Sequence, residues 1–212
     1  MGISERMEIY GNILKVNLRR QYPWPALAAV ALLVLTRLLF NLNALEGAAV
    51  AQPLEMLMIW IGPALLATVF LPEQNPEIRD VVRARQTGYM QVCVLRILYA
   101  SLTIIALILV FTGIMKAYES QVLPYHIWGS VCSALLFGAV GLAAAGLSGN
   151  AAGGFMVCML YYLASYGMGR RLGCFSLFSM TKGQMSGKGW QLLTAVALVV
   201  ASLAIMRRRK QI

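Results

Sequence analysis

Long apolar stretches alternate with short polar ones along the whole chain. A helix needs about 20 mostly apolar residues to cross the hydrocarbon layer of a membrane, or roughly 17 at the shortest. Stretches of that length predict six spanning segments: Pro23–Leu42, Leu54–Leu71, Val92–Met115, Ile127–Leu147, Ala151–Met168 and Trp190–Met206. Each must be a helix, because an isolated strand would leave backbone polar groups unpaired in lipid. The pattern therefore predicts an all-α polytopic membrane protein with six transmembrane helices.

The composition excludes a water-soluble protein. Hydrophobic residues make up 59% of the chain and charged residues 12%, whereas soluble proteins have about 45–50% and about 25%. The mean hydropathy is +0.71. No long polar insertion divides the chain, so we expect one domain over residues 1–212. Within it, residues 1–22 precede the bundle, residues 23–206 hold the spans and residues 207–212 form a basic tail.

The distribution of cations predicts the orientation. The chain carries 18 lysines and arginines against 8 acids, for a net charge of +10. Placing the N-terminus inside puts twelve of these 18 cations on the cytoplasmic side, as expected for membrane proteins. Both termini are therefore expected in the cytoplasm, and the positive charge is not taken as a sign of a nucleic-acid partner. Gly169–Gly189 does not fit, since it places four cations outside.

Two interpretations apply to the N-terminal region. In Ile3–Arg20, apolar residues recur at helical spacing and basic residues gather near the membrane, which suits an amphipathic helix lying in the lipid headgroups. A merely flanking basic segment is the alternative.

The sequence Ala49-Val50-Ala51 has the form of a signal-peptide cleavage site. We expect no cleavage, because the region before Pro23 is long for a signal peptide and Arg37 interrupts its apolar core.

The most distinctive polar segment is Pro72–Tyr89, between the second and third spans. Asn75 can cap a helix whose first residue is Pro76, where a missing N–H costs nothing. Acids come early and arginines late, which matches the helix dipole: Glu77, Asp80, Arg83 and Arg85. The segment therefore predicts a short amphipathic helix at the cytoplasmic surface.

This helix is either a surface connector or a docking element for a cytoplasmic protein. Its mixed charge favours a protein partner over anionic lipid, because a lipid-binding face would be more uniformly basic. The residues expected to make the contact are Glu73, Gln74, Glu77, Ile78, Arg79, Val82, Arg83 and Arg85.

The run from Leu71 to Arg79, followed by Arg85 and Tyr89, together with the six-span plan, resembles the permeases of ABC-2 (type V) exporters. This resemblance implies that the charged helix is a coupling helix, that a separate ATP-binding subunit holds ATP and Mg²⁺, and that a second permease copy or homologue completes the path. It also implies a bacterial cytoplasmic membrane location. Leu172–Met180 is apolar but too short to cross, as the re-entrant outer pieces of that family are.

The chain lacks the parts of an enzyme. It contains no G-x-x-x-x-G-K-[ST] loop, so we expect no ATP hydrolysis and no cofactor in this chain. Its one histidine, His126, lies among aromatic residues and is expected to mark a membrane boundary. The cysteines are expected to be small buried hydrophobes, neither a disulfide framework nor a metal site: Cys93, Cys132, Cys158 and Cys174.

Three charges lie in or at the ends of the predicted spans: Arg37, Glu55 and Arg96. Such residues are candidates for function or for pairing. We expect Arg37 to reach the outer headgroups or to pair with Glu55 at the start of the second span. Arg96 is expected to anchor the third span at the cytoplasmic boundary or to support the preceding helix.

Small residues recur every four positions from the fourth to the fifth span: Gly141, Ala145, Gly149 and Gly153. Such ladders allow helix backbones to approach closely. Packing within the chain and a seam between two copies are both open interpretations.

The expected function is therefore the permease subunit of an ATP-driven exporter. A non-transport assembly or immunity protein that acts through helix packing is the alternative. An intramembrane enzyme acting on lipids has less support, because no catalytic acid pair or metal cluster is present.

Overall fold

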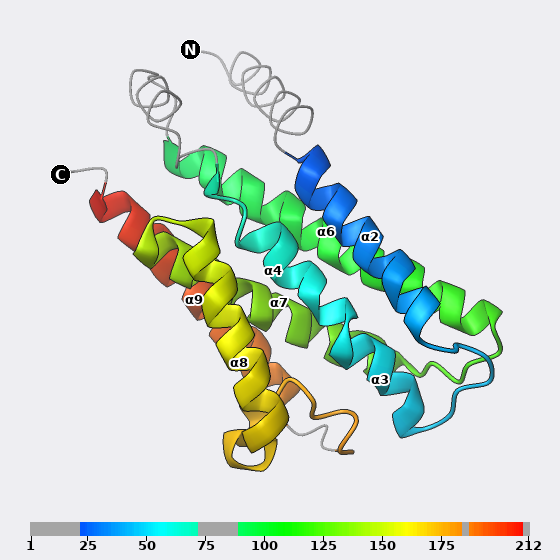
Figure 1. The fold of residues 1–212 in the computed structure, drawn as a ribbon. Coiled ribbons are helices and arrows are strands. Elements are labelled where there is room, and N and C mark those ends of the chain that lie inside the picture. The colour runs from blue at the N-terminus through cyan, green and yellow to red at the C-terminus, as the bar shows by residue number, and fades with distance from the viewer. Residues whose placement is uncertain (1–21, 72–88, 184–186, 210–212) are drawn as a thin grey trace.

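The computed structural model describes residues 22–71, 89–183 and 187–209. Within these ranges the protein is helical and contains no strand (Figure 1). In chain order the elements are α2 (Pro23–Leu39), α3 (Ala48–Met56), the 3₁₀ turn η1 (Met58–Trp60), α4 (Ile61–Leu66), α6 (Tyr89–Ala117), α7 (Pro124–Ser148), α8 (Ala151–Leu172), the 3₁₀ turn η3 (Gly173–Phe175) and α9 (Lys188–Arg209).

Five helical segments of the described chain are long and apolar enough to cross a membrane, judged by length and composition. They are Ala48–Leu66, Met90–Ala117, Pro124–Ser148, Ala151–Gly169 and Lys188–Arg207. The remaining predicted span, the first in chain order, corresponds to α2, which is apolar but only 17 residues long. The prediction of an all-helical membrane protein is thus confirmed in its coarse form.

The second apolar segment begins earlier than the sequence predicted. We expected it to start at Leu54, whereas helix α3 starts at Ala48. Residues before Leu54 include small, helix-compatible alanines that extend the helix toward the preceding loop. Glu55 therefore lies inside this segment and is fully buried, not at its boundary.

A break divides this segment into α3 and α4. Pro63 has no N–H to donate to the carbonyl of Ile59, and its ring disfavours a regular helix there. The chain passes through η1 instead, where the N–H of Trp60 donates to the carbonyl of Leu57. The carbonyl of Met56, which Trp60 would have used in a regular helix, accepts from the hydroxyl of Tyr162 at 3.2 Å.

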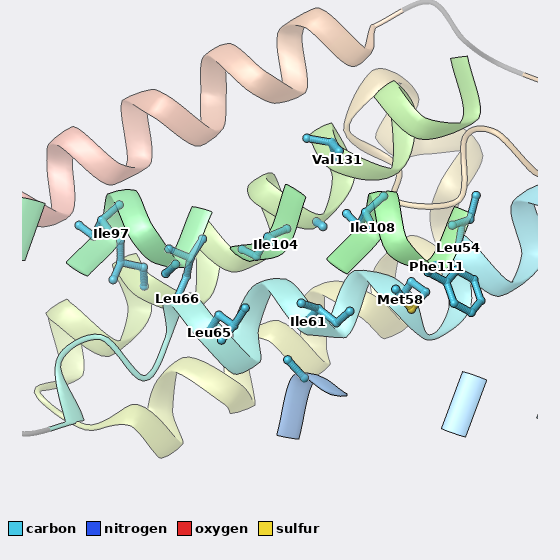
Figure 2. Close-up of a cluster of buried hydrophobic side chains, with 14 of the residues drawn as sticks. Leu54, Met58, Ile61, Leu65, Leu66, Ile97, Ile104, Ile108, Phe111 and Val131 are labelled. Atoms are coloured by element: carbon cyan, nitrogen blue, oxygen red, sulfur yellow. The ribbon is translucent and has the colours of Figure 1, made fainter. Parts of the chain in front are cut away.

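Helices α4 and α7 form the centre of the bundle. Helix α7 packs against α4, α6, α8 and α9, and α4 also contacts α2 and α6. The largest apolar cluster lies between α3, α4, α6 and α7 (Figure 2). Its labelled members are Leu54, Met58, Ile61, Leu65, Leu66, Ile97, Ile104, Ile108, Phe111 and Val131. Helices α2, α8 and α9 lie outside this centre and expose apolar side chains, as lipid-facing helices do.

Two glycines bring the backbones of α4 and α7 into contact. A Cβ on Gly62 would lie 2.1 Å from the carbonyl oxygen of Ala134, and one on Gly138 would lie 2.7 Å from the oxygen of Gly62. Of the predicted small-residue ladder, Gly141 faces Cys158 of α8, and Gly149 ends α7 in a left-handed conformation. The small residues of the ladder therefore do not lie on one continuous helix face. Their contacts favour packing within the chain over a seam between two copies.

The variants Gly62→Ala and Gly138→Ala should each lower the free energy of unfolding by about 1–3 kcal/mol, because the added methyl group meets backbone atoms that cannot move aside easily. Gly113→Ala on α6 is the matched control, since nothing lies within 4 Å of its Cβ position. Thermal unfolding in detergent measures all three. Equal stability of the Gly62 and Gly113 variants would contradict the close contact of α4 with α7.

Candidate functional site

The residues predicted to dock a partner lie outside the described residues: Glu73, Gln74, Glu77, Ile78, Arg79, Val82, Arg83 and Arg85. The structure does describe the two ends from which their segment departs, Leu71 after α4 and Tyr89 at the start of α6. Both lie toward the same end of the bundle as the start of α2 and the end of α9 (Figure 1). The charged segment thus joins the bundle at the end where α2 begins and α9 ends.

Arg96 lies on α6 near this end and is buried. Its Nη1 donates to the carbonyl oxygen of Val69, just after α4, at 3.4 Å. The rings of Tyr22 and Tyr99 pack edge to face beside it, with centroids 4.8 Å apart. Together with Thr68 these residues line a cavity of about 20 Å³, room for a single water molecule. Arg96 therefore connects the chain that follows α4 to the start of α6, and these are the two ends from which the charged segment departs.

Arg37 does not pair with Glu55, which was one of the two arrangements that we expected for it. Its guanidinium lies over the ring of Tyr118, with the carbon Cζ 4.3 Å from the ring centroid. This is a cation–π contact that joins the last turn of α2 to the chain that follows α6.

Glu55 instead accepts hydrogen bonds from several donors, at the end of the bundle opposite to Arg96. One carboxylate oxygen accepts the backbone N–H of Met180 at 2.7 Å. The other accepts the N–H and the hydroxyl of Thr181, at 2.9 and 2.5 Å. The ammonium of Lys188 lies 3.8 Å from the first oxygen. A buried carboxylate is tolerated when its charge is paired and its lone pairs are used, and both conditions hold here.

The hydrogen bonds continue from Lys188 through the bundle. Its ammonium donates to Ser133 Oγ of α7 at 2.6 Å, and Ser133 donates to Gln191 Oε1 of α9 at 3.2 Å. The amide nitrogen of Gln191 then donates to the carbonyls of Cys174 and Ser176, at 2.8 and 3.0 Å. We call Glu55, Ser133, Thr181, Lys188 and Gln191 the polar cluster; it joins α3, α7 and α9 to the connection between α8 and α9.

The polar cluster gives a physical reason for one cation in the stretch Gly169–Gly189 that the sequence left unexplained. Lys188 is buried and begins α9 as the counterion of a carboxylate on another helix. The position of Lys188 is therefore determined by its ion pair inside the protein, and not by the preference of lysine and arginine for cytoplasmic loops.

The apolar piece Leu172–Met180 folds back onto the bundle and makes no spanning helix. After η3 it continues in turns, and the side chains of Leu177, Phe178 and Met180 are buried. Phe178 meets the ring of Tyr162 at 5.2 Å between centroids, and the hydroxyl of Tyr161 donates to the carbonyl of Phe175 at 2.5 Å. Side chains from neighbouring helices thus hold a segment with little regular structure of its own.

His126 acts locally. Its Nδ1 accepts the N–H of Leu123 at 3.2 Å and so caps the start of α7. No group of three or more potential metal-binding side chains occurs among the described residues. Cys93, Cys132 and Cys158 are buried, and Cys174 is half-buried.

No protein-family model, curated protein or solved structure matches this chain. The resemblance to the ABC-2 permeases therefore rests on the charged segment and the pattern of spans, and the function it implies is a proposal.

Sequence reasoning identified Glu55 but missed the other members of the polar cluster. It chose Arg37 as the partner because that cation is near in the sequence and was placed on the same side. A useful signal was present: Ser133 interrupts an apolar helix, and Lys188 and Gln191 stand one turn apart at the start of another. A search of every cation on that side for the counterion of Glu55 would have included Lys188.

Ser133→Ala should lower the free energy of unfolding by about 1–3 kcal/mol, because it removes a hydrogen-bond partner from a buried ammonium. Ser130→Ala is the matched control: its hydroxyl is equally buried on the same helix and has no hydrogen-bond partner among the described residues. That variant should change stability little. Thermal unfolding in detergent compares the two, and equal losses would show that the bond from Lys188 contributes nothing.

Proposed function

We propose that this chain is the permease subunit of an ATP-driven ABC exporter, which forms the translocation path and couples to a separate ATP-binding subunit. The observation that carries the proposal is the charged segment 72–88, with its acid-first, arginine-last order, inserted between α4 and α6 at the end of the bundle where α2 begins and α9 ends. A second permease copy or a homologue completes the path.

The proposed membrane arrangement has six crossings, with α2 as the first. An even number of crossings leaves both termini and residues 72–88 on one side, and the count of lysines and arginines makes that side the cytoplasm. In this arrangement the polar cluster lies toward the outer face of a bacterial cytoplasmic membrane.

Coupling in this proposal is mechanical. Closure of the ATP-binding subunits pushes on the charged segment 72–88, which contains Arg79, Arg83 and Arg85. The push reaches α4 through Leu71 and α6 through Tyr89, and the bond from Arg96 to Val69 makes these two connections move together. Helix α4 passes the displacement to α7 through the backbone contact at Gly62. ATP and Mg²⁺ belong to the partner subunit.

The triple charge reversal Arg79→Glu, Arg83→Glu and Arg85→Glu should abolish co-purification of an ATP-hydrolysing subunit from native membranes, because it replaces the cations of the docking helix with repelling charges. Lys116→Glu is the matched control, since Lys116 ends α6 at the opposite end of the bundle. The control should retain the subunit. The measurement is the ATPase activity and composition of the purified complex.

Recovery of the same ATP-hydrolysing subunit with the triple variant would contradict the docking role. Recovery of a different cytoplasmic protein with the wild-type chain, lost only in the triple variant, would instead support an assembly or immunity protein.

A further inference from the structure

The connection between α8 and α9 is held in place mainly by side chains from other elements. Residues 173–183, which we call the lid, contain η3 and turns. Three successive carbonyls of the lid, those of Cys174, Phe175 and Ser176, accept from Gln191 and Tyr161. Its other end is bound through Met180 and Thr181 to the carboxylate of Glu55.

Both ends of the lid are glycines in conformations that other residues rarely adopt. Gly173 has a φ of 53° and Gly183 a φ of 71°. A Cβ at either position would have nothing within 4 Å, so crowding does not explain the glycines. Glycine gives the backbone freedom to rotate, and hinges are commonly placed at the ends of elements. The lid therefore has at each end a glycine, which restricts the backbone least of all residues, and its contacts fix it between them.

The apolar contacts of the lid are of a kind that can separate. Met180 fills a notch at Gly129 on α7, where a Cβ would lie 2.3 Å from its sulfur. Leu177 and Phe178 are buried beside it. A methionine in a glycine notch makes a contact without interlocking branches, and the flexible side chain can leave the notch by rotation.

The polar cluster gives the lid two acceptable states. In the closed state the charges of Glu55 and Lys188 are buried and satisfied by each other and by the lid. Moving the lid away would admit water, which satisfies both charges as well. Three hydroxyls in the same region, those of Ser130, Ser176 and Ser179, are buried without a hydrogen-bond partner among the described residues, and hydration would favour them too.

We infer that residues 173–183 form a lid that swings about Gly173 and Gly183 and that the ion pair of Glu55 with Lys188 is the latch that holds it closed. Opening separates Met180 and Thr181 from Glu55 and exposes the ends of α3, α7 and α9. If the chain is an exporter permease, as proposed above, the lid closes the outer exit of the path; this role alone rests on that proposal.

The chain contains a natural reporter for lid opening. Cys174 lies in the lid and is half-buried, whereas Cys93, Cys132 and Cys158 are buried on α6, α7 and α8. A charged maleimide applied to the purified protein in detergent should therefore label Cys174 slowly in the wild-type protein. Cys93 reports unfolding, because it lies in the central apolar cluster, away from the lid, and reacts only when the bundle opens.

The variants Glu55→Gln and Lys188→Met should each raise the rate of Cys174 labelling by about tenfold or more, because each removes the charge pair and with it hydrogen bonds to an ionised group. One label per chain is expected, and none in a Cys174→Ser background. Glu46→Gln is the matched control: it removes an exposed carboxylate, bound to Gln121, at the same end of the bundle. It should leave the labelling rate unchanged.

Two results would overturn the latch. One is an unchanged labelling rate in both variants. The other is labelling of all four cysteines together, which would make the ion pair a support of the whole bundle and not of the lid.

A second arm separates the lid from the exporter proposal. In the wild-type complex, ATP turnover by the partner subunit should accelerate Cys174 labelling. Faster labelling in Glu55→Gln combined with no effect of ATP would support the lid and contradict the exporter.

Discussion

A hydrocarbon layer offers no hydrogen-bond partners, and this constraint accounts for most of the structure. Regular helices satisfy their own backbone groups, and the described chain departs from them in few places inside its apolar segments. Where α3 breaks and where α8 ends, side chains supply the missing partners. Tyr162 donates to the carbonyl of Met56 where α3 breaks, and Gln191 and Tyr161 donate to the carbonyls that follow α8. The buried charge of Glu55 is treated in the same way.

The same constraint determines how far the sequence can predict the structure. Helices and their approximate limits follow from apolar length alone, so four of the expected spans coincide closely with helical segments, while the second is displaced toward the N-terminus. The partner of Glu55 does not follow, because it depends on how α9 and the chain before it return to α3. Local sequence patterns, such as an N-cap or an apolar stripe, do not show which distant helix a segment packs against. The contacts of Gly62 with α7 were missed for the same reason, since glycine in an apolar stretch does not say which helix it meets.

The two polar regions of the bundle lie at opposite ends and are connected through its centre. Arg96 ties α6 to the end of α4, and the polar cluster ties α3, α7 and α9 together. Between them, α4 touches α7 backbone to backbone, while η1 separates α4 from α3. A displacement that begins at Leu71 therefore passes to α7 more directly than to α3.

The shortness of α2 has a consequence for the surrounding lipid. Its 17 residues span about 25 Å at 1.5 Å per residue, less than the roughly 30 Å of a typical hydrocarbon core. Arg37, held over Tyr118, marks where that length ends. If α2 crosses the membrane, the bilayer beside it has to thin by a few ångström, whereas beside the longer α6 it does not. The protein would then impose uneven thickness on its annular lipids and would be most stable among short acyl chains.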